Sequence, residues 1–148
     1  VRRITVDHDL PLAVIAPYRT DHPLVTALDP FVLRHAVKGD TLNILLNAGE
    51  LRSAVADLAV ADGVLCVGSP ANVSLTGTKF RLEDVEPELM AIADVAIDYG
   101  LCAYHNPQGL SSTMIDFSTF RVQRAGVCYE RIAAILADEF GVELRRPA

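Results

Sequence analysis

Short apolar runs alternate along this chain with longer amphipathic segments, and the alternation predicts both strands and helices. Apolar runs that are closed by turn-forming residues are typical of buried strands. Such runs lie at residues 10–16, 41–47, 64–67 and 95–99. Near the end of the chain, residues 112–117 and 120–124 are separated by Ser118-Thr119, and this arrangement predicts a hairpin.

Two segments carry apolar side chains at helical spacing, so that these side chains fall on one helix face. In residues 50–61 they are Leu51, Val55, Leu58 and Ala59. In residues 128–140 they are Tyr129, Ile132, Ala133, Leu136 and Phe140. Shorter helices are expected at residues 31–37 and near 84–93, where Pro87 suits a first helical turn because no N–H is needed there.

The order of these elements predicts a layered α/β fold with a mixed sheet, because strands and helices alternate before the hairpin. A chain of 148 residues, of which 51% are hydrophobic and 22% charged, suits one globular domain with a sizeable core. We expect this domain to cover residues 1–142 and a short tail to cover 143–148. No linker, repeat or low-complexity tract divides the sequence.

Charge and hydropathy narrow the class of function. A formal net charge of −6 argues against a broad electrostatic surface for nucleic acid and favours a small ligand. A local basic patch remains an alternative; its candidate residues are Arg34, Lys38, Lys79, Arg81, Arg145 and Arg146. No apolar run approaches the roughly 18 residues of a membrane span, and the first residues do not resemble a secretory leader. We therefore expect a soluble, cytoplasmic protein without a membrane partner.

The residues that usually bind metals or act as nucleophiles show no informative spacing. The three cysteines contain no C-x-x-C pair, and the four histidines lack the spacing of metal ligands. No G-x-S-x-G motif and no Walker loop occurs either. The sequence thus predicts no disulfide framework, no protein-bound metal and no hydrolytic triad.

The first candidate binding segment is the loop at residues 68–74, which follows an expected strand. Its small residues would let a phosphate approach the backbone, while Asn72 and Ser74 offer polar groups for oxygen atoms. Ligands of open α/β sheets bind beyond the carboxyl ends of strands, as this loop would allow. The alternative is an ordinary strand-to-helix turn in which Asn72 and Ser74 cap backbone groups.

The second candidate combines Ser112 and Thr113 at the start of a strand with Arg124 at the end of the next strand. Arginine suits a phosphate ligand because its planar fork can donate two parallel hydrogen bonds. A surface salt bridge of Arg124 is the alternative. The hydroxyls of Ser112 and Thr113 could equally be ordinary hydrogen bonders at a strand start.

Six segments occur in the same order as motifs of the YrdC-like, threonylcarbamoyl-AMP-synthase-like family, and nearly the whole chain resembles it. The segments are Arg2-Arg3 ahead of PLAVIA, TLNILLNAG, GSPANVSLTG, ADVAIDYG, SSTMID and VQRAG. The corresponding family motifs are K-x-R, T-x-x-L, S-A-N-x-S-G, D-x-x-I-D-x-G, S-T-x-x-D and x-x-R-x-G.

The resemblance implies a twisted three-layer α/β domain with a concave, positively lined cleft that binds nucleotides and double-stranded RNA. The family's best-known activity is threonylcarbamoyl-AMP synthesis, in which threonine and bicarbonate form a carbamate that attacks the α-phosphate of ATP and releases pyrophosphate. The expected ligands are then ATP with Mg²⁺, threonine and bicarbonate, with the metal held mainly by the phosphates. The product serves tRNA modification, so tRNA or double-stranded RNA is an expected partner.

The resemblance also assigns nucleotide or substrate binding to individual residues, although it assigns catalysis to none. They are Arg3, Asn72, Ser74, Ser112, Thr113 and Arg124. Because all three lie at strand ends, Asn72, Ser112 and Arg124 are expected to converge on one cleft.

This chain departs from the family pattern in three places. Pro70 replaces the first serine of the S-A-N-x-S loop, and Val1 stands where the lysine of K-x-R belongs. The family's opening P-T-x-T-x-Y-G-L segment is also absent, so the domain is expected to be incomplete at its amino terminus and to turn over poorly. A non-catalytic YrdC-like module that binds nucleotide or double-stranded RNA is therefore the alternative to a synthase.

Overall fold

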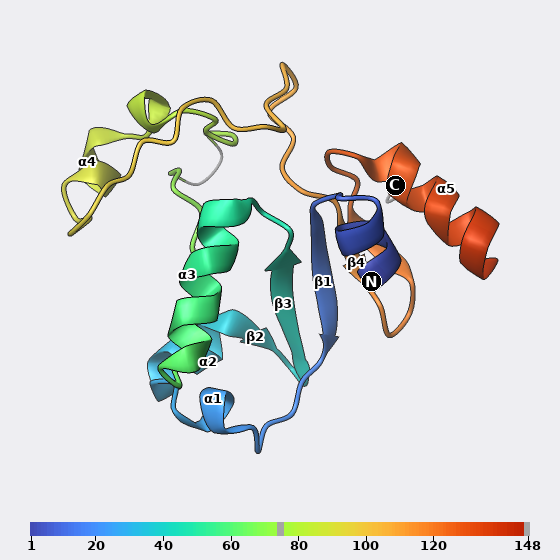
Figure 1. Ribbon diagram of the computed structural model, residues 1–148, viewed down its shortest axis with the longest axis horizontal. Coiled ribbons are helices and arrows are strands. Elements are labelled where there is room, and N and C mark those ends of the chain that lie inside the picture. Colours follow the sequence, from blue (N-terminus) through green and yellow to red (C-terminus); the bar gives the residue numbers. More distant parts are fainter. Residues whose placement is uncertain (74–75, 147–148) are drawn as a thin grey trace. The chain divides into compact units, whose positions relative to one another are not determined.

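The computed structural model describes residues 1–73 and 76–146. It forms two compact units, one made of Val1–Val67 and Ser112–Ala148 and the other of Gly68–Ser111 (Figure 1). Among the described residues, no helix combines the length and apolar character that crossing a membrane requires.

The first unit contains a five-stranded mixed sheet with the strand order β2-β3-β1-β4-β5. Its central strand β1 (Leu12–Pro17) pairs antiparallel with β3 (Thr41–Leu46) and parallel with β4 (Met114–Asp116). The edges are β2 (Val37–Lys38) and β5 (Arg121–Arg124), which pair antiparallel with β3 and β4. The α/β class and the mixed sheet are confirmed, and β4 with β5 forms the predicted hairpin.

The helices of the first unit are the short π-helix η1 (Arg3–Asp7), α1 (Pro23–Thr26), α2 (Pro30–Ala36), α3 (Glu50–Ala61) and α5 (Tyr129–Phe140). Three of them, α2, α3 and α5, begin and end close to predicted positions, whereas η1 and α1 were not predicted. The side chain of Asp29 accepts a hydrogen bond of 2.7 Å from the N–H of Phe31, which gives α2 a conventional N-cap. Gly141, at a φ of 65°, ends α5 in the left-handed conformation that glycine adopts most readily.

The core lies on one face of the sheet. Leu12 and Val14 are two residues apart on β1, so both side chains lie on this face. Val14 pairs with Ile115 of β4. The helices η1 and α5 cover them, as Figure 1 shows for the blue and red ends of the ribbon. The buried cluster consists of Ile4, Leu10, Leu12, Val14, Ile115, Ile132, Ile135 and Leu136. Val142 and Leu144, which follow α5, are partly buried against it.

The helix α3 shows that correct periodicity does not guarantee burial. Its bounds agree with the predicted residues 50–61, yet none of its side chains is buried. Its apolar face remains largely exposed, with Leu58 at 68%. A hydrogen bond of 3.0 Å from Nη1 of Arg52 to the backbone oxygen of Leu45 links α3 to β3.

Two predicted strands, at residues 64–67 and 95–99, are wrong, because neither segment has strand structure here. Val64 and Val67 are exposed, as is Tyr99. A strand needs a neighbour for its backbone hydrogen bonds, and the local apolar pattern carries no information about whether such a neighbour is present.

The second unit consists of short elements joined by loops. It contains a 3₁₀ turn, η2 (Leu82–Asp84), and the helix α4 (Pro87–Met90), which begins at the predicted proline but ends earlier than predicted. A backbone hydrogen bond of 2.9 Å from Cys102 to Phe80 connects distant parts of the unit. None of the large apolar side chains in the described part of this unit belongs to the buried core.

The one-sided core leads to a prediction about stability. Replacement of fully buried Ile132 by alanine leaves a cavity beneath α5, and we expect the free energy of unfolding to fall by about 2–5 kcal/mol. The matched control is Leu58→Ala in exposed α3, for which we expect a change within about 0.5 kcal/mol. Urea unfolding of both variants gives the comparison, and equal losses would contradict this account of the core.

Candidate anion-binding site

The hairpin brings the second group of candidate residues together. At its turn, Oδ1 of Asp116 accepts hydrogen bonds from the N–H and the hydroxyl of Ser118, at 2.8 and 2.6 Å. These bonds lower the pKa of Asp116 below its ordinary value. Beyond the other end of the hairpin, Ser112 forms a parallel bridge with Val127. Two hydrogen bonds place Arg124 beside Ser112.

Arg124 is held by Ser112 through two hydrogen bonds. Its Nε donates to the backbone oxygen of Ser112 at 2.8 Å, and its Nη2 donates to the Ser112 hydroxyl at 3.3 Å. Partial burial lowers the pKa of Arg124, although an arginine remains protonated at neutral pH. A rigidly held cation beside a hydroxyl can bind an anionic oxygen.

In the described part of the chain, no neighbouring carboxylate neutralises the charge of Arg124. No Asp or Glu within residues 1–73 and 76–146 forms an ion pair with it. Its Nη1 also makes no hydrogen bond within these ranges. The salt-bridge alternative for Arg124 is therefore not observed in the described part of the chain.

Thr113 lies in the same group but is completely buried. Its hydroxyl donates to the backbone oxygen of Val127 at 2.9 Å and accepts from the N–H of Gly126 at 3.1 Å. Both bonds hold the segment that follows β5.

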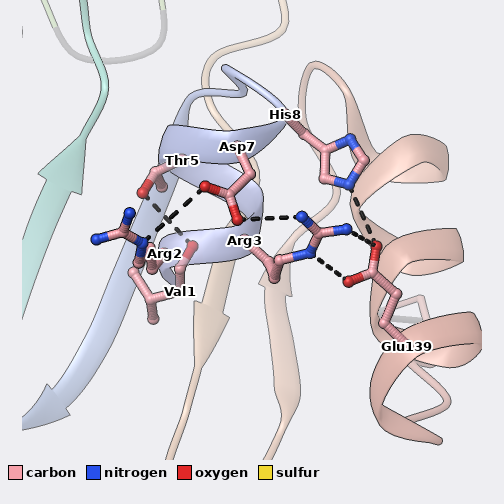
Figure 2. Close-up of polar contacts among 7 residues, drawn as sticks. All are labelled: Val1, Arg2, Arg3, Thr5, Asp7, His8 and Glu139. Carbon is pink, nitrogen blue, oxygen red and sulfur yellow. Dashed lines mark hydrogen bonds and ion pairs between the residues drawn. The ribbon is translucent and has the colours of Figure 1, made fainter.

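Arg3 lies in a different environment, an ion-pair network between η1 and the last turn of α5 (Figure 2). Its Nε and Nη2 donate to the two carboxylate oxygens of Glu139, at 2.5 and 3.0 Å, and its Nη1 donates to Asp7 at 3.1 Å. His8 Nε2 lies 3.2 Å from Oε1 of the same Glu139.

This network neutralises Arg3. Its hydrogen bonds to Glu139 and then to Asp7 raise the pKa of Arg3, and the same bond with Arg3 lowers the pKa of Glu139. Neither a hydrogen bond nor an ion pair connects Arg3 to the described residues Ser112, Thr113 and Arg124. The prediction that Arg3 binds a nucleotide remains a prediction, and in this structure its guanidinium already has anionic partners.

The first candidate loop belongs to the second unit. Asn72 donates from Nδ2 to the backbone oxygen of Val73 at 3.0 Å, which is a local loop contact. Ser74 lies outside the described residues. The predicted convergence of Asn72 with Ser112 and Arg124 remains a prediction, since Asn72 belongs to a different unit.

The second unit also contains a polar cluster that sequence reasoning missed. Lys79 Nζ lies 2.9 Å from Oε1 of Glu86, and the Thr76 hydroxyl donates to the same oxygen at 2.8 Å. The other carboxylate oxygen of Glu86 is buried and has no hydrogen-bond partner among the residues that the structure describes. The hydrogen bonds from Lys79 and then Thr76 lower the pKa of Glu86 to about 2. No recognised spacing motif signals such a cluster, because a turn brings its members together.

Within the described residues, no group of three or more His, Cys, Asp or Glu side chains could hold a metal ion. Comparison of the chain with protein-family models, with curated proteins and with solved structures found no match. The case for a functional site therefore depends on the geometry of Ser112, Thr113 and Arg124.

The Glu86 cluster gives a prediction about pH. Because the folded-state pKa lies below the ordinary value of 4.5, this carboxylate stabilises the fold at pH values above about 4.5. The contribution is lost as the pH falls through the folded value of about 2. We expect a ¹³C NMR titration to give that low value for Glu86.

Lys79→Met should return the Glu86 pKa toward 4.5, because it removes the largest cause of the shift. The control is Glu88→Gln in α4, an exposed carboxylate, which should leave the titration of Glu86 unchanged. A Glu86 pKa that does not move in Lys79→Met would show that Lys79 is not the cause.

Proposed function

We propose that this chain is a threonylcarbamoyl-AMP-synthase-like protein of the YrdC-like family, in which Ser112 and Arg124 bind a phosphate of ATP. One observation carries the proposal: the Arg124 guanidinium is fixed by Ser112 and has no carboxylate partner in the described chain. Such a group binds phosphate well, because its charge is available and its orientation is already set.

The hydrogen bonds of Arg124 indicate how a phosphate would bind. The Nε hydrogen and one hydrogen of Nη2 are donated to Ser112. Nη1 and the second hydrogen of Nη2 are left as adjacent donors. Two adjacent donors match two oxygens of one phosphate group. The Ser112 hydroxyl lies next to this fork and could complete the contact.

A held cation of this kind also suits the proposed chemistry. When the carbamate of threonine attacks the α-phosphate, negative charge accumulates on the phosphate oxygens before pyrophosphate leaves. A guanidinium already in place stabilises that charge without reorganising. Mg²⁺ would be held mainly by the phosphates of ATP, and the described side chains provide no separate metal cage.

The second candidate is a non-catalytic YrdC-like module that binds nucleotide or double-stranded RNA, including tRNA. The network around Arg3 favours it, because a cation already paired with Glu139 and Asp7 has less charge to offer a triphosphate. Pro70 favours it as well, since proline offers neither a hydroxyl nor an N–H.

Pyrophosphate release distinguishes these candidates. A synthase releases pyrophosphate only when ATP, threonine and bicarbonate are all present, and it forms threonylcarbamoyl-AMP in equal amount. A binding module retains ATP but releases no pyrophosphate above the rate of a reaction without protein. Binding of a radiolabelled ATP analogue, measured on the same preparation, shows whether the nucleotide site is intact.

We expect Arg124→Ala to weaken Mg·ATP binding by about tenfold or more, because charge-assisted hydrogen bonds each contribute about 1.5–3 kcal/mol. The fold should remain intact, since Arg124 is an exposed residue of an edge strand. The matched control is Arg121→Ala, which removes the other exposed arginine of β5. Isothermal titration calorimetry and thermal unfolding provide the two readouts. Equal ATP affinities in the two variants would falsify the assignment.

A further inference from the structure

The hydroxyl of Thr113 is a buried polar group with both of its hydrogen-bonding functions in use. It donates to the Val127 oxygen and accepts from the Gly126 N–H, at 2.9 and 3.1 Å. The side chain has no solvent-exposed surface. A ligand could reach this hydroxyl only if the segment after β5 moved away.

The position of Thr113 links the site to the centre of the sheet. Its backbone oxygen accepts a hydrogen bond of 2.8 Å from Ala13 of the central strand β1. Ser112 precedes it directly, while Gly126 and Val127 follow Arg124 closely along the chain. One hydroxyl thus joins the segment that carries Ser112 to the segment that carries Arg124.

The segment held by Thr113 has little other regular support. Residues 125 and 126 lie between the end of β5 and the Ser112–Val127 bridge. Directly after this bridge, Cys128 adopts a left-handed conformation with a φ of 61°, and α5 begins at Tyr129. Such a conformation is uncommon for a residue other than glycine and needs support from its surroundings. The two hydrogen bonds of Thr113 provide support immediately before it.

We propose that Thr113 is a positioning residue for the anion site: its hydroxyl holds Gly126 and Val127 so that Arg124 reaches Ser112. This indirect role is proposed in place of the predicted direct contact between Thr113 and a ligand. The link between this role and ATP affinity rests on the proposed function. The effect of Thr113 on the position of Arg124 does not rest on the proposed function, and it can be measured without a ligand.

The test compares Thr113→Val with Thr113→Ser in the full chain. Valine has nearly the same shape as threonine but no hydroxyl, so Gly126 and Val127 lose their partner. Serine keeps the hydroxyl and removes only a methyl group. The first readout is the ¹⁵N–¹H resonance of Arg124 Nε, which reports its hydrogen bond to Ser112; Arg124→Ala assigns that resonance. The second is the affinity for Mg·ATP.

We expect Thr113→Val to move the Arg124 Nε resonance toward that of a free arginine and to weaken Mg·ATP binding by about fivefold or more. Thr113→Ser should keep the resonance and hold the affinity within about twofold of the unchanged protein, because its hydroxyl can form the same bonds. Thermal unfolding monitors the fold. If Thr113→Val does not fold, the test depends on Thr113→Ser alone. Loss of the Arg124 Nε resonance in Thr113→Ser would then overturn the inference, because the methyl group and not the hydroxyl would position Arg124.

The remaining outcomes separate this inference from the proposed function. A less stable Thr113→Val with an unchanged Arg124 resonance and ATP affinity overturns it, because Thr113 would then have a structural role only. Loss of ATP binding in Thr113→Val but not in Thr113→Ser, with an unchanged resonance in both, also overturns it, and indicates direct contact between the hydroxyl and the ligand. If none of the proteins binds Mg·ATP but the resonance responds to valine and not to serine, the positioning role stands and the proposed nucleotide site fails.

Discussion

Burial of one apolar face of the sheet beneath α5 is the interaction on which the rest of the first unit depends. The helix follows the edge strand β5, so the chain must turn back across the sheet before Ile132 and Leu136 can reach the core. That return places residues 125–128 next to the start of β4. The turn that closes the core therefore lies beside the candidate site, and the Thr113 hydroxyl stabilises that turn through its bonds to Gly126 and Val127.

Sequence pattern predicted those elements that carry a strong local signal. The helices α3 and α5, the strands β1 and β3 and the hairpin lie close to their expected residues. The pairing of Ser112 with Arg124 was also foreseeable, because a hairpin brings its two ends together. Burial was less predictable, because α3 has a clear apolar stripe but no buried side chain. The segments at residues 64–67 and 95–99, which were expected to be strands, have no strand structure. Local periodicity reports which side chains share a face and not what covers that face.

The two arginines that the resemblance singles out differ in their electrostatic surroundings. Arg3 is neutralised by Glu139, which lies at the far end of the sequence and could not have been connected to it by spacing. Arg124 is bound to neutral oxygens of Ser112 and keeps its charge available. In a chain with a net charge of −6, anion binding depends on such local arrangements and not on an overall positive field.

The parallel pairing of β1 with β4 joins parts of the chain about a hundred residues apart, and the second unit lies within that interval. Once such an interval is closed, its length has a small influence on stability, because loop-closure entropy grows only with the logarithm of length. Doubling the intervening chain would cost only about 0.6 kcal/mol. Insertions and deletions between α3 and β4 should therefore cost the sheet little, whereas a change of one residue between β5 and α5 would displace the segment that Thr113 and Ser112 contact.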